Sequence, residues 1–304
     1  MPVSTTRSEL LKKRVDQFKR VLHALEEGDV RALHQARVTS RRMRELLPML
    51  QLDRPVARKL GRRLRKVTSR LGTVRELDVL LILIDEVHVS GRRGSGGLGR
   101  VGVRVSKDRD RARKRLAAEL PVAELARLSR KLSRIADDLN EAERSSSKTN
   151  ARSWRWAIEA RVAKRAGSLT SAVADAGALY LPDRLHAVRI AVKKLRYAVE
   201  LSAEVSRDRS IADLRVLKRS QELLGRMHDV QMLIDQVRQT QASLAPPSIT
   251  VWRDLDTLVA SLEDDCRRLH ARYMRERDAL SGVAARRGEP PHPSTSRVQA
   301  RRAG

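Results

Sequence analysis

The hydrophobic positions of this chain recur with the spacing of α-helices along nearly its whole length. Apolar residues return every three or four positions, and no run alternates apolar and polar residues for long enough to form a strand. The chain is therefore predicted to be all-α. The predicted helices cover residues 7–26, 30–51, 54–71, 74–89, 103–120, 121–144, 151–176, 182–206, 208–224, 227–241 and 248–281.

Two segments of this pattern occur twice. LHQARVTSRRMREL at 33–46 returns in altered form as LHAVRIAVKKLRYAVE, and LGTVRELDVLLIL returns as LGRMHDVQMLIDQV. His34 aligns with His186, 152 positions later, and Gly72 aligns with Gly225, 153 positions later. The shared order and spacing indicate an internal duplication.

The duplication predicts two antiparallel four-helix bundles related by a pseudo-two-fold axis. The polar segment SSSKTN at 145–150 separates the copies. The first bundle then covers residues 1–150 and the second covers 151–285. The Pro-, Ser- and Arg-rich end, 286–304, has the composition of a disordered basic tail.

The first repeated segment gathers basic residues on one side of its helix. Since a helix turns about 100° per residue, these residues fall within an arc of about 80°, opposite the apolar side. They form the first stripe: His34, Arg37, Arg41 and Arg44. The second copy has the same arrangement and forms the second stripe: His186, Arg189, Lys193 and Arg196. Arg42 and Lys194 lie to one side of these stripes.

The net charge of the chain indicates which class of ligand these stripes would bind. The net charge is +27, from 64 Lys and Arg against 37 Asp and Glu. Like charges three or four positions apart on a helix repel each other, so an anion lying along them would be stabilising. Arg donates paired hydrogen bonds to phosphate, and a phosphate beside histidine favours its protonated form. Stripes that faced each other would line a basic groove for a linear polyanion; the alternative is a solvated basic face with two helix-packing histidines.

Several classes of protein fit the sequence poorly. A single cysteine, Cys266, excludes an internal disulfide. No apolar stretch reaches the length of a membrane span, and the first residues lack the apolar segment of a signal peptide, so we expect no membrane association and a cytoplasmic location. The glycine-rich segment 90–100 lies between predicted helices, which favours a flexible helix–helix connection over a phosphate-binding loop.

The four repeated segments together resemble the signature segments of the CHAD family, the conserved histidine α-helical domain. The resemblance extends over roughly residues 7–281. It implies two four-helix bundles related by pseudo-two-fold symmetry and the binding of inorganic polyphosphate along a basic surface or pore, in some members at polyphosphate granules. No cofactor is implied.

Carried over by position, the resemblance implies that both stripes, Arg42 and Lys194 face polyphosphate. Basic residues on neighbouring helices extend this set: Arg62, Arg63, Lys66, Lys218 and Arg219, with Arg58, Arg65 and Arg215 also plausible. The family has Arg-Asp after its Leu-Gly step, whereas this chain has Arg75-Glu76 and His228-Asp229. An acidic residue there could hold a basic side chain by a salt bridge, and the longer glutamate puts the geometry of the first copy in doubt.

Catalysis and metal binding are not expected. Phosphate hydrolysis needs carboxylates that hold a divalent metal, and the nearest such string, Glu141-Ala142-Glu143, lies in a helical pattern without the strands of a triphosphate tunnel. Each stripe offers one histidine among cations, which does not suit zinc. Non-specific binding of nucleic acid through phosphates remains the alternative function, although aromatic side chains for base stacking are only 2% of the chain.

Overall fold

The computed structural model is helical throughout its described segments, residues 5–91, 94–145, 148–205, 211–244 and 248–288. No strand occurs in these ranges, so the all-α prediction is confirmed. The helices are α1 (Arg7–Arg20), α2 (Leu22–Glu26), α3 (Val30–Leu46), η1 (Leu47–Met49), α4 (Arg54–Val89), η2 (Ser95–Gly97), α5 (Leu98–Glu119), α6 (Val122–Arg144), α7 (Lys148–Ala176), α8 (Pro182–Val205), α9 (Ile211–Ala242) and α10 (Ile249–Gly288).

Local sequence signals fix several helix ends. The Asp29 side chain accepts a hydrogen bond from the backbone N–H of Ala32 at 2.6 Å, which caps α3 at its start. Thr6 and Glu9 form a reciprocal capping box at the start of α1. Pro121 lacks a backbone N–H and separates α5 from α6. The cap on α3 fixes the register of the helix that carries the first stripe.

Two predicted helix breaks are wrong. The structure has one continuous helix, α4, in place of the pair predicted at 54–71 and 74–89. It also has one continuous helix, α9, in place of the pair predicted at 208–224 and 227–241. Gly72 and Gly225 lie inside them and terminate neither. Leu71 and Val74, on either side of Gly72, are fully buried, so packing offsets the roughly 1 kcal/mol propensity cost of a glycine in a helix.

The buried apolar side chains form three clusters. The first joins α1, α3, the first half of α4, α6 and the start of α7. The second joins α7, α8, the first half of α9 and the end of α10. The third joins α5, the second halves of α4 and α9, and the first half of α10, and includes Cys266. Five long helices, α4, α7, α8, α9 and α10, therefore each take part in two clusters, α8 through Leu201 and Val205 in the first.

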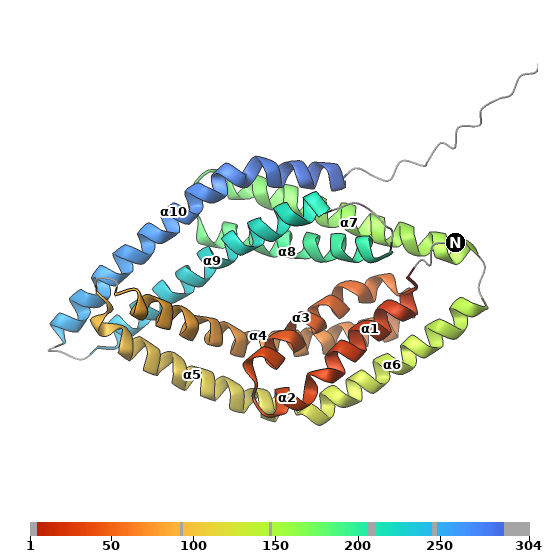
Figure 1. The fold of residues 1–304 in the computed structure, drawn as a ribbon, viewed down its shortest axis with the longest axis horizontal. Helices are drawn as coiled ribbons and strands as arrows, with labels where there is room; N and C mark the ends of the chain where they lie inside the picture. The colour runs from red at the N-terminus through yellow and green to blue at the C-terminus, as the bar shows by residue number, and fades with distance from the viewer. Residues whose placement is uncertain (1–4, 92–93, 146–147, 206–210, 245–247, 289–304) are drawn as a thin grey trace, which may run out of the picture.

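The same order of pairing recurs in each half of the chain. α1 packs on α3, α3 on α4 and α4 on α5, whereas α7 packs on α8, α8 on α9 and α9 on α10. The duplication, its axis and the domain boundary at 150 stay predictions, and Trp154 and Ile158 beyond that boundary pack in the first cluster. The halves meet where α3 contacts α8 and α4 contacts α9, near the middle of the elongated fold (Figure 1).

Two connecting segments differ from their predictions. Gly94, at φ +79°, packs so closely on α10 that a Cβ there would lie 2.3 Å from the Asp254 carbonyl oxygen, so the described part of segment 90–100 is docked on α10. Residues 92–93 lie outside the described residues. Residues 286–288, predicted to belong to the tail, continue α10, and residues 289–304 also lie outside the described residues.

Candidate functional site

Helices α3, α4, α8 and α9 enclose a cavity of about 260 Å³ where the two halves of the chain meet. We call it the central cavity. Six cationic side chains line it against two carboxylates, and two imidazoles complete its ionisable groups. The cations are Arg37, Arg41, Arg75, Arg189, Lys193 and Arg196; the carboxylates are Glu76 and Asp229; the imidazoles are His34 and His228. Both predicted stripes therefore contribute to one space.

The first stripe enters the cavity with three of its four residues. His34, Arg37 and Arg41 line the cavity, whereas Arg44 does not. Burial, with Arg41 as the next cause, lowers the pKa of Arg37 to about 10 although Glu76 opposes the shift. The Arg37 Nε is buried without a hydrogen-bond partner among the described residues. Because this nitrogen lies beside Gly72 of α4, it belongs to the contact between α3 and α4.

The second stripe also contributes three residues. Arg189, Lys193 and Arg196 line the cavity. Arg196 donates to Gln221 Oε1 at 2.8 Å, pairs with Glu200 and lies 4.8 Å from the centre of the Tyr197 ring. The Arg189 Nε, like that of Arg37, is buried and lacks a partner in the described part of the chain. Each half of the chain therefore supplies a partly buried guanidinium group to the lining of the cavity.

Lys193 is the most unusual group of the cavity. Lys193 is only 9% exposed, and no carboxylate of the described residues lies within ion-pair distance of its amine. Burial, followed by Arg189, Arg41 and Arg37, lowers its pKa to about 6, while Asp229 opposes the shift. An amine held in this way becomes strongly cationic only when negative charge approaches.

The two cavity carboxylates occupy equivalent positions on α4 and α9. Glu76 forms an ion pair with Arg37 at 3.3 Å, which agrees with the salt bridge suggested for this position. Asp229 attracts Arg189 and Lys193, although burial raises its own pKa. Each carboxylate therefore faces a stripe residue from the neighbouring helix of its own half.

Gly72 gives α3 room to approach α4 at the cavity. A Cβ at this position would lie 3.2 Å from the Arg37 Nε, whereas a Cβ at Gly225 would meet nothing within 4 Å. Close helix packing therefore involves Gly72 and not Gly225.

The glycines allow a matched test of this packing. Gly225→Ala is expected to raise the free energy of unfolding by about 0.5–1 kcal/mol, the usual gain inside a helix. Gly72→Ala should give a smaller gain or a loss, because the added methyl group presses on Arg37. Urea unfolding followed by circular dichroism measures both. Equal gains at the two positions would contradict the packing argument.

Comparison with known proteins places this geometry in a family. The family model for the CHAD domain matches residues 9–238, three quarters of the chain. The chain belongs to the CHAD family. No protein with a curated description matches it.

Two solved structures share the CHAD fold with this chain. The crystal structure of the CHAD domain from the plant Ricinus communis has a TM-score of 0.65 at 23% identity, covering 94% of this chain and 93% of that one. PptA from Streptomyces chartreusis has a TM-score of 0.54 at 20% identity, covering 92% of this chain and 97% of that one. At these identities the similarity concerns the fold alone.

His186 lies beside the cavity of this CHAD domain rather than in it. Its Nδ1 is 3.3 Å from the Nδ1 of His228, and the ring centres are 4.6 Å apart. His186 lines a small neighbouring pocket with Tyr180 and Gln231, whereas His228 lines both that pocket and the central cavity. The second histidine of the repeat therefore reaches the cavity through another imidazole.

The predicted residues to the side of the stripes are occupied elsewhere. Arg42 pairs with Glu200 of α8 at 3.2 Å, which ties α3 to the second half. Arg44 and Lys194 lie together near Glu45, outside the central cavity.

The extended set on α4 and α9 points to solvent. Arg219 pairs with Glu276 of α10 at 3.0 Å. None of this set lines the central cavity, and its exposed members are Arg58, Arg62, Arg63, Arg65, Lys66, Arg215, Lys218 and Arg219. These cations can add only diffuse charge to the cavity.

Sequence reasoning left out six polar residues of the lining, among them Glu76, which was noted only beside Arg75 as a departure from the family pattern. Arg75, His228 and Asp229 were noted only as departures from the family pattern, and Tyr197 and Gln221 were not assigned to the site. A usable signal existed, because Arg75-Glu76 and His228-Asp229 hold matching positions after the paired glycines. Matching positions in a duplicated chain predict matching placement.

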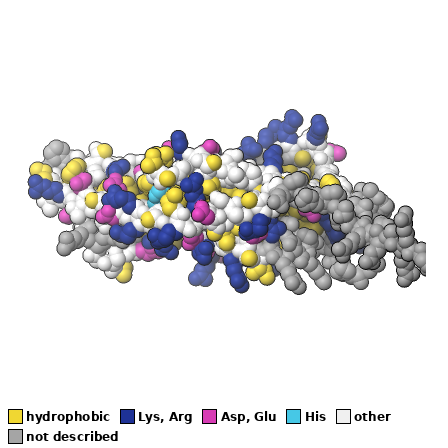
Figure 2. All heavy atoms as spheres, turned by 90° about the horizontal axis from the view of Figure 1, so that it is seen from above, with side chains coloured by type: hydrophobic (Ala, Val, Ile, Leu, Met, Phe, Trp, Pro, Cys, Tyr) yellow, Lys and Arg dark blue, Asp and Glu magenta, His cyan; other side chains and the backbone are white. Residues whose placement is uncertain are grey.

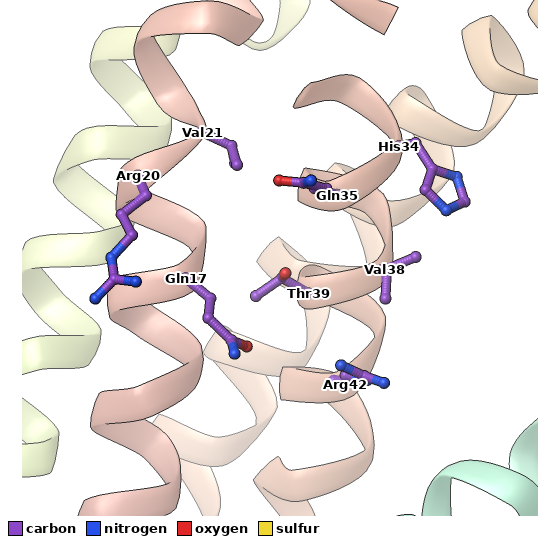
Figure 3. A pocket seen from close by; sticks show the side chains of 8 residues that line it. All are labelled: Gln17, Arg20, Val21, His34, Gln35, Val38, Thr39 and Arg42. Atoms are coloured by element: carbon purple, nitrogen blue, oxygen red, sulfur yellow. The ribbon is translucent and has the colours of Figure 1, made fainter. Parts of the chain in front are cut away.

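A second cleft lies on the other side of α3. Gln17 and Arg20 of α1, with Val21 just after it, face Gln35, Thr39 and Arg42 of α3 across a volume of about 370 Å³, and His34 lies at its edge, turned away from α1 (Figure 3). His34 also lines the central cavity, so it marks the boundary between the two spaces. This cleft carries two Arg and no carboxylate, and it is much less basic than the cavity.

One face of the outer surface is mixed in charge. On the visible part of the face in Figure 2, Lys and Arg are spread out with Asp and Glu among them. Among the described residues there is no cluster of three or more His, Cys, Asp or Glu that could hold a metal ion. No described helix has an apolar stretch long enough to cross a membrane.

Proposed function

We propose that this CHAD domain binds inorganic polyphosphate in the central cavity without cleaving it. The observation that carries the proposal is the convergence of both stripes on one cavity, with five arginines and Lys193 against two carboxylates. The guanidinium groups of Arg37 and Arg189, one from each stripe, line this cavity and can donate paired hydrogen bonds to the oxygens of a phosphate chain. Family membership supports the same ligand class.

Binding without hydrolysis follows from the roles of the two carboxylates. Glu76 is engaged by Arg37, and Asp229 faces Arg189 and Lys193. Hydrolysis of phosphoanhydrides commonly uses carboxylates that hold a divalent ion, and here both are directed at cationic side chains. We place the protein in the cytoplasm, in association with polyphosphate granules.

A thin phosphate chain fits this site better than duplex DNA does. Polyphosphate carries anionic oxygens along a flexible chain that can enter a space between helices. Duplex DNA is stiff and carries its phosphates on the outside of a wide cylinder, so it meets only exposed cations. Salt weakens both interactions by counterion release, but contacts in a partly desolvated cavity are screened less.

Competition between the two ligands tests the proposal. Long-chain polyphosphate is expected to stay bound at a salt concentration that releases duplex DNA of equal total charge. Fluorescence anisotropy with labelled DNA, and with polyphosphate of graded length as competitor, measures this order. Displacement of long-chain polyphosphate by duplex DNA at matched charge in near-physiological salt would favour nucleic-acid binding instead. Phosphate release on incubation with magnesium would contradict the non-catalytic assignment.

A further inference from the structure

A second group of basic side chains lies beyond the central cavity, where the first stripe ends. Four helices, α3, α4, α7 and α8, contribute to it. We call it the Glu45 cluster: Arg44, Arg65, Arg161, Arg165 and Lys194 around Glu45.

The ion pairs of this cluster are largely desolvated. Arg161 Nη2 lies 2.9 Å from Glu45 Oε2, and Arg165 Nη2 lies 2.9 Å from the same oxygen and 3.1 Å from Oε1. The side chains of Arg161, Arg165 and Glu45 are 18%, 15% and 12% exposed. Two guanidinium groups thus share one buried carboxylate.

The positive charge of the cluster exceeds what this pairing requires. Burial lowers the pKa of Arg44, with Arg65 as the next cause, and burial followed by Arg165 lowers the pKa of Lys194. The Nε atoms of Arg161 and Arg165 are buried and have no partner among the described residues. One carboxylate cannot neutralise five neighbouring cations, so the cluster is arranged for additional negative charge.

The cluster is continuous with the cavity along two helices. Arg41 lines the cavity, and Arg44 follows on the same stripe after three residues, a rise of about 4.5 Å. Lys193 lines the cavity, and the next residue, Lys194, belongs to the cluster. An anionic chain that leaves the cavity along α3 therefore meets the Glu45 cluster.

We propose that the Glu45 cluster is a second subsite for phosphoryl groups, in which Arg161 and Arg165 bind the part of a polyphosphate chain that extends beyond the central cavity. The inference rests on the proposed function. Glu45 holds the two arginines in position in the free protein and competes with the ligand for them. A long chain supplies phosphoryl groups to both sites, whereas tripolyphosphate has only three to divide between them.

Two opposite substitutions test the subsite. In Arg161→Gln/Arg165→Gln, the ratio of long-chain to tripolyphosphate affinity is expected to fall about five-fold, because the second contact of a long chain is lost. In Glu45→Gln, the same ratio should rise about three-fold, because the competing carboxylate is gone. Isothermal titration calorimetry with each probe measures both. A purely structural role for these ion pairs predicts no rise in Glu45→Gln.

Controls keep the outcomes distinct. Arg267→Gln/Arg268→Gln removes two exposed arginines that pair locally on α10 and serves as the charge-matched control. If the double variant leaves Glu45 unpaired and fails to fold, Glu45→Gln/Arg161→Gln/Arg165→Gln removes the buried charges together and should also lower the ratio. An unchanged ratio, or one no lower than in the control, overturns the subsite. If the wild-type protein binds neither probe, the proposed function fails and the subsite with it.

Discussion

Replacing Arg37 and Arg41 together by glutamine is expected to weaken the binding of long-chain polyphosphate about 100-fold, because each charged hydrogen-bond donor contributes roughly 1.5 kcal/mol and 1.4 kcal/mol corresponds to a factor of ten. Replacing Arg189 by glutamine and Lys193 by methionine should cause a loss of similar size. Both pairs line the same cavity from opposite halves of the chain, so neither half can hold the ligand alone. Isothermal titration calorimetry with a long-chain probe gives the affinities.

The comparison with exposed cations makes this prediction specific. Arg62→Gln/Arg63→Gln removes the same charge from α4 outside the cavity, and its loss should stay within about three-fold, as for solvated surface charges. Circular dichroism must show that each variant is folded, since Arg37 pairs with Glu76. If losing either cavity pair costs no more than losing Arg62 and Arg63, the ligand is held by diffuse surface charge and the shared cavity is wrong.

The sequence predicted what depends on periodicity. The helical pattern gave the all-α class, and the stripe on 30–51 placed Arg37 and Arg41 on one face, where the structure has them. The matching stripe placed Arg189 and Lys193 correctly for the same reason. These residues sit mid-helix, where 100° per residue is a reliable guide.

Other features depend on packing between distant segments, which periodicity does not report. Gly72 suggests a helix end by propensity, yet buried neighbours on both sides keep α4 continuous. His186 shares the phase of its stripe but meets His228 of α9 instead of the cavity. Arg44 continues its stripe but does not line the cavity, and its charged neighbours beyond Arg41 are Glu45, Arg65 and Arg165.

The second large effect that we expect is a dependence of polyphosphate binding on pH. In the free protein, burial lowers the pKa of Lys193 to about 6 and that of His228 to about 4, with Arg189 the next cause for both. Burial, followed by Arg75, also lowers the pKa of His34. These three bases are therefore mostly uncharged near pH 8, and each can take up a proton and become positively charged.

The sign of the stability effect follows from these shifts. The ordinary pKa of Lys193 is 10.5, so between about 6 and 10.5 the unfolded chain binds more protons at this position than the folded chain. Lys193 therefore lowers the free energy of unfolding of the free protein as the pH falls from 10.5 toward 6. A bound phosphate chain raises the pKa of Lys193 in the folded state and opposes this loss.

Long-chain polyphosphate should consequently bind more tightly at pH 6 than at pH 8, by up to about ten-fold per pH unit for each proton taken up. Titration calorimetry in two buffers of different ionisation enthalpy should show net proton uptake on binding. Lys193→Met should lose most of this pH dependence and bind more weakly. It should also raise the free energy of unfolding of the free protein, because a buried amine among Arg37, Arg41 and Arg189 is replaced by an apolar chain. The same pH slope in the wild type and Lys193→Met, or proton release on binding, would show that the charge of Lys193 is not coupled to the ligand, and the cavity would then bind through its guanidinium groups alone.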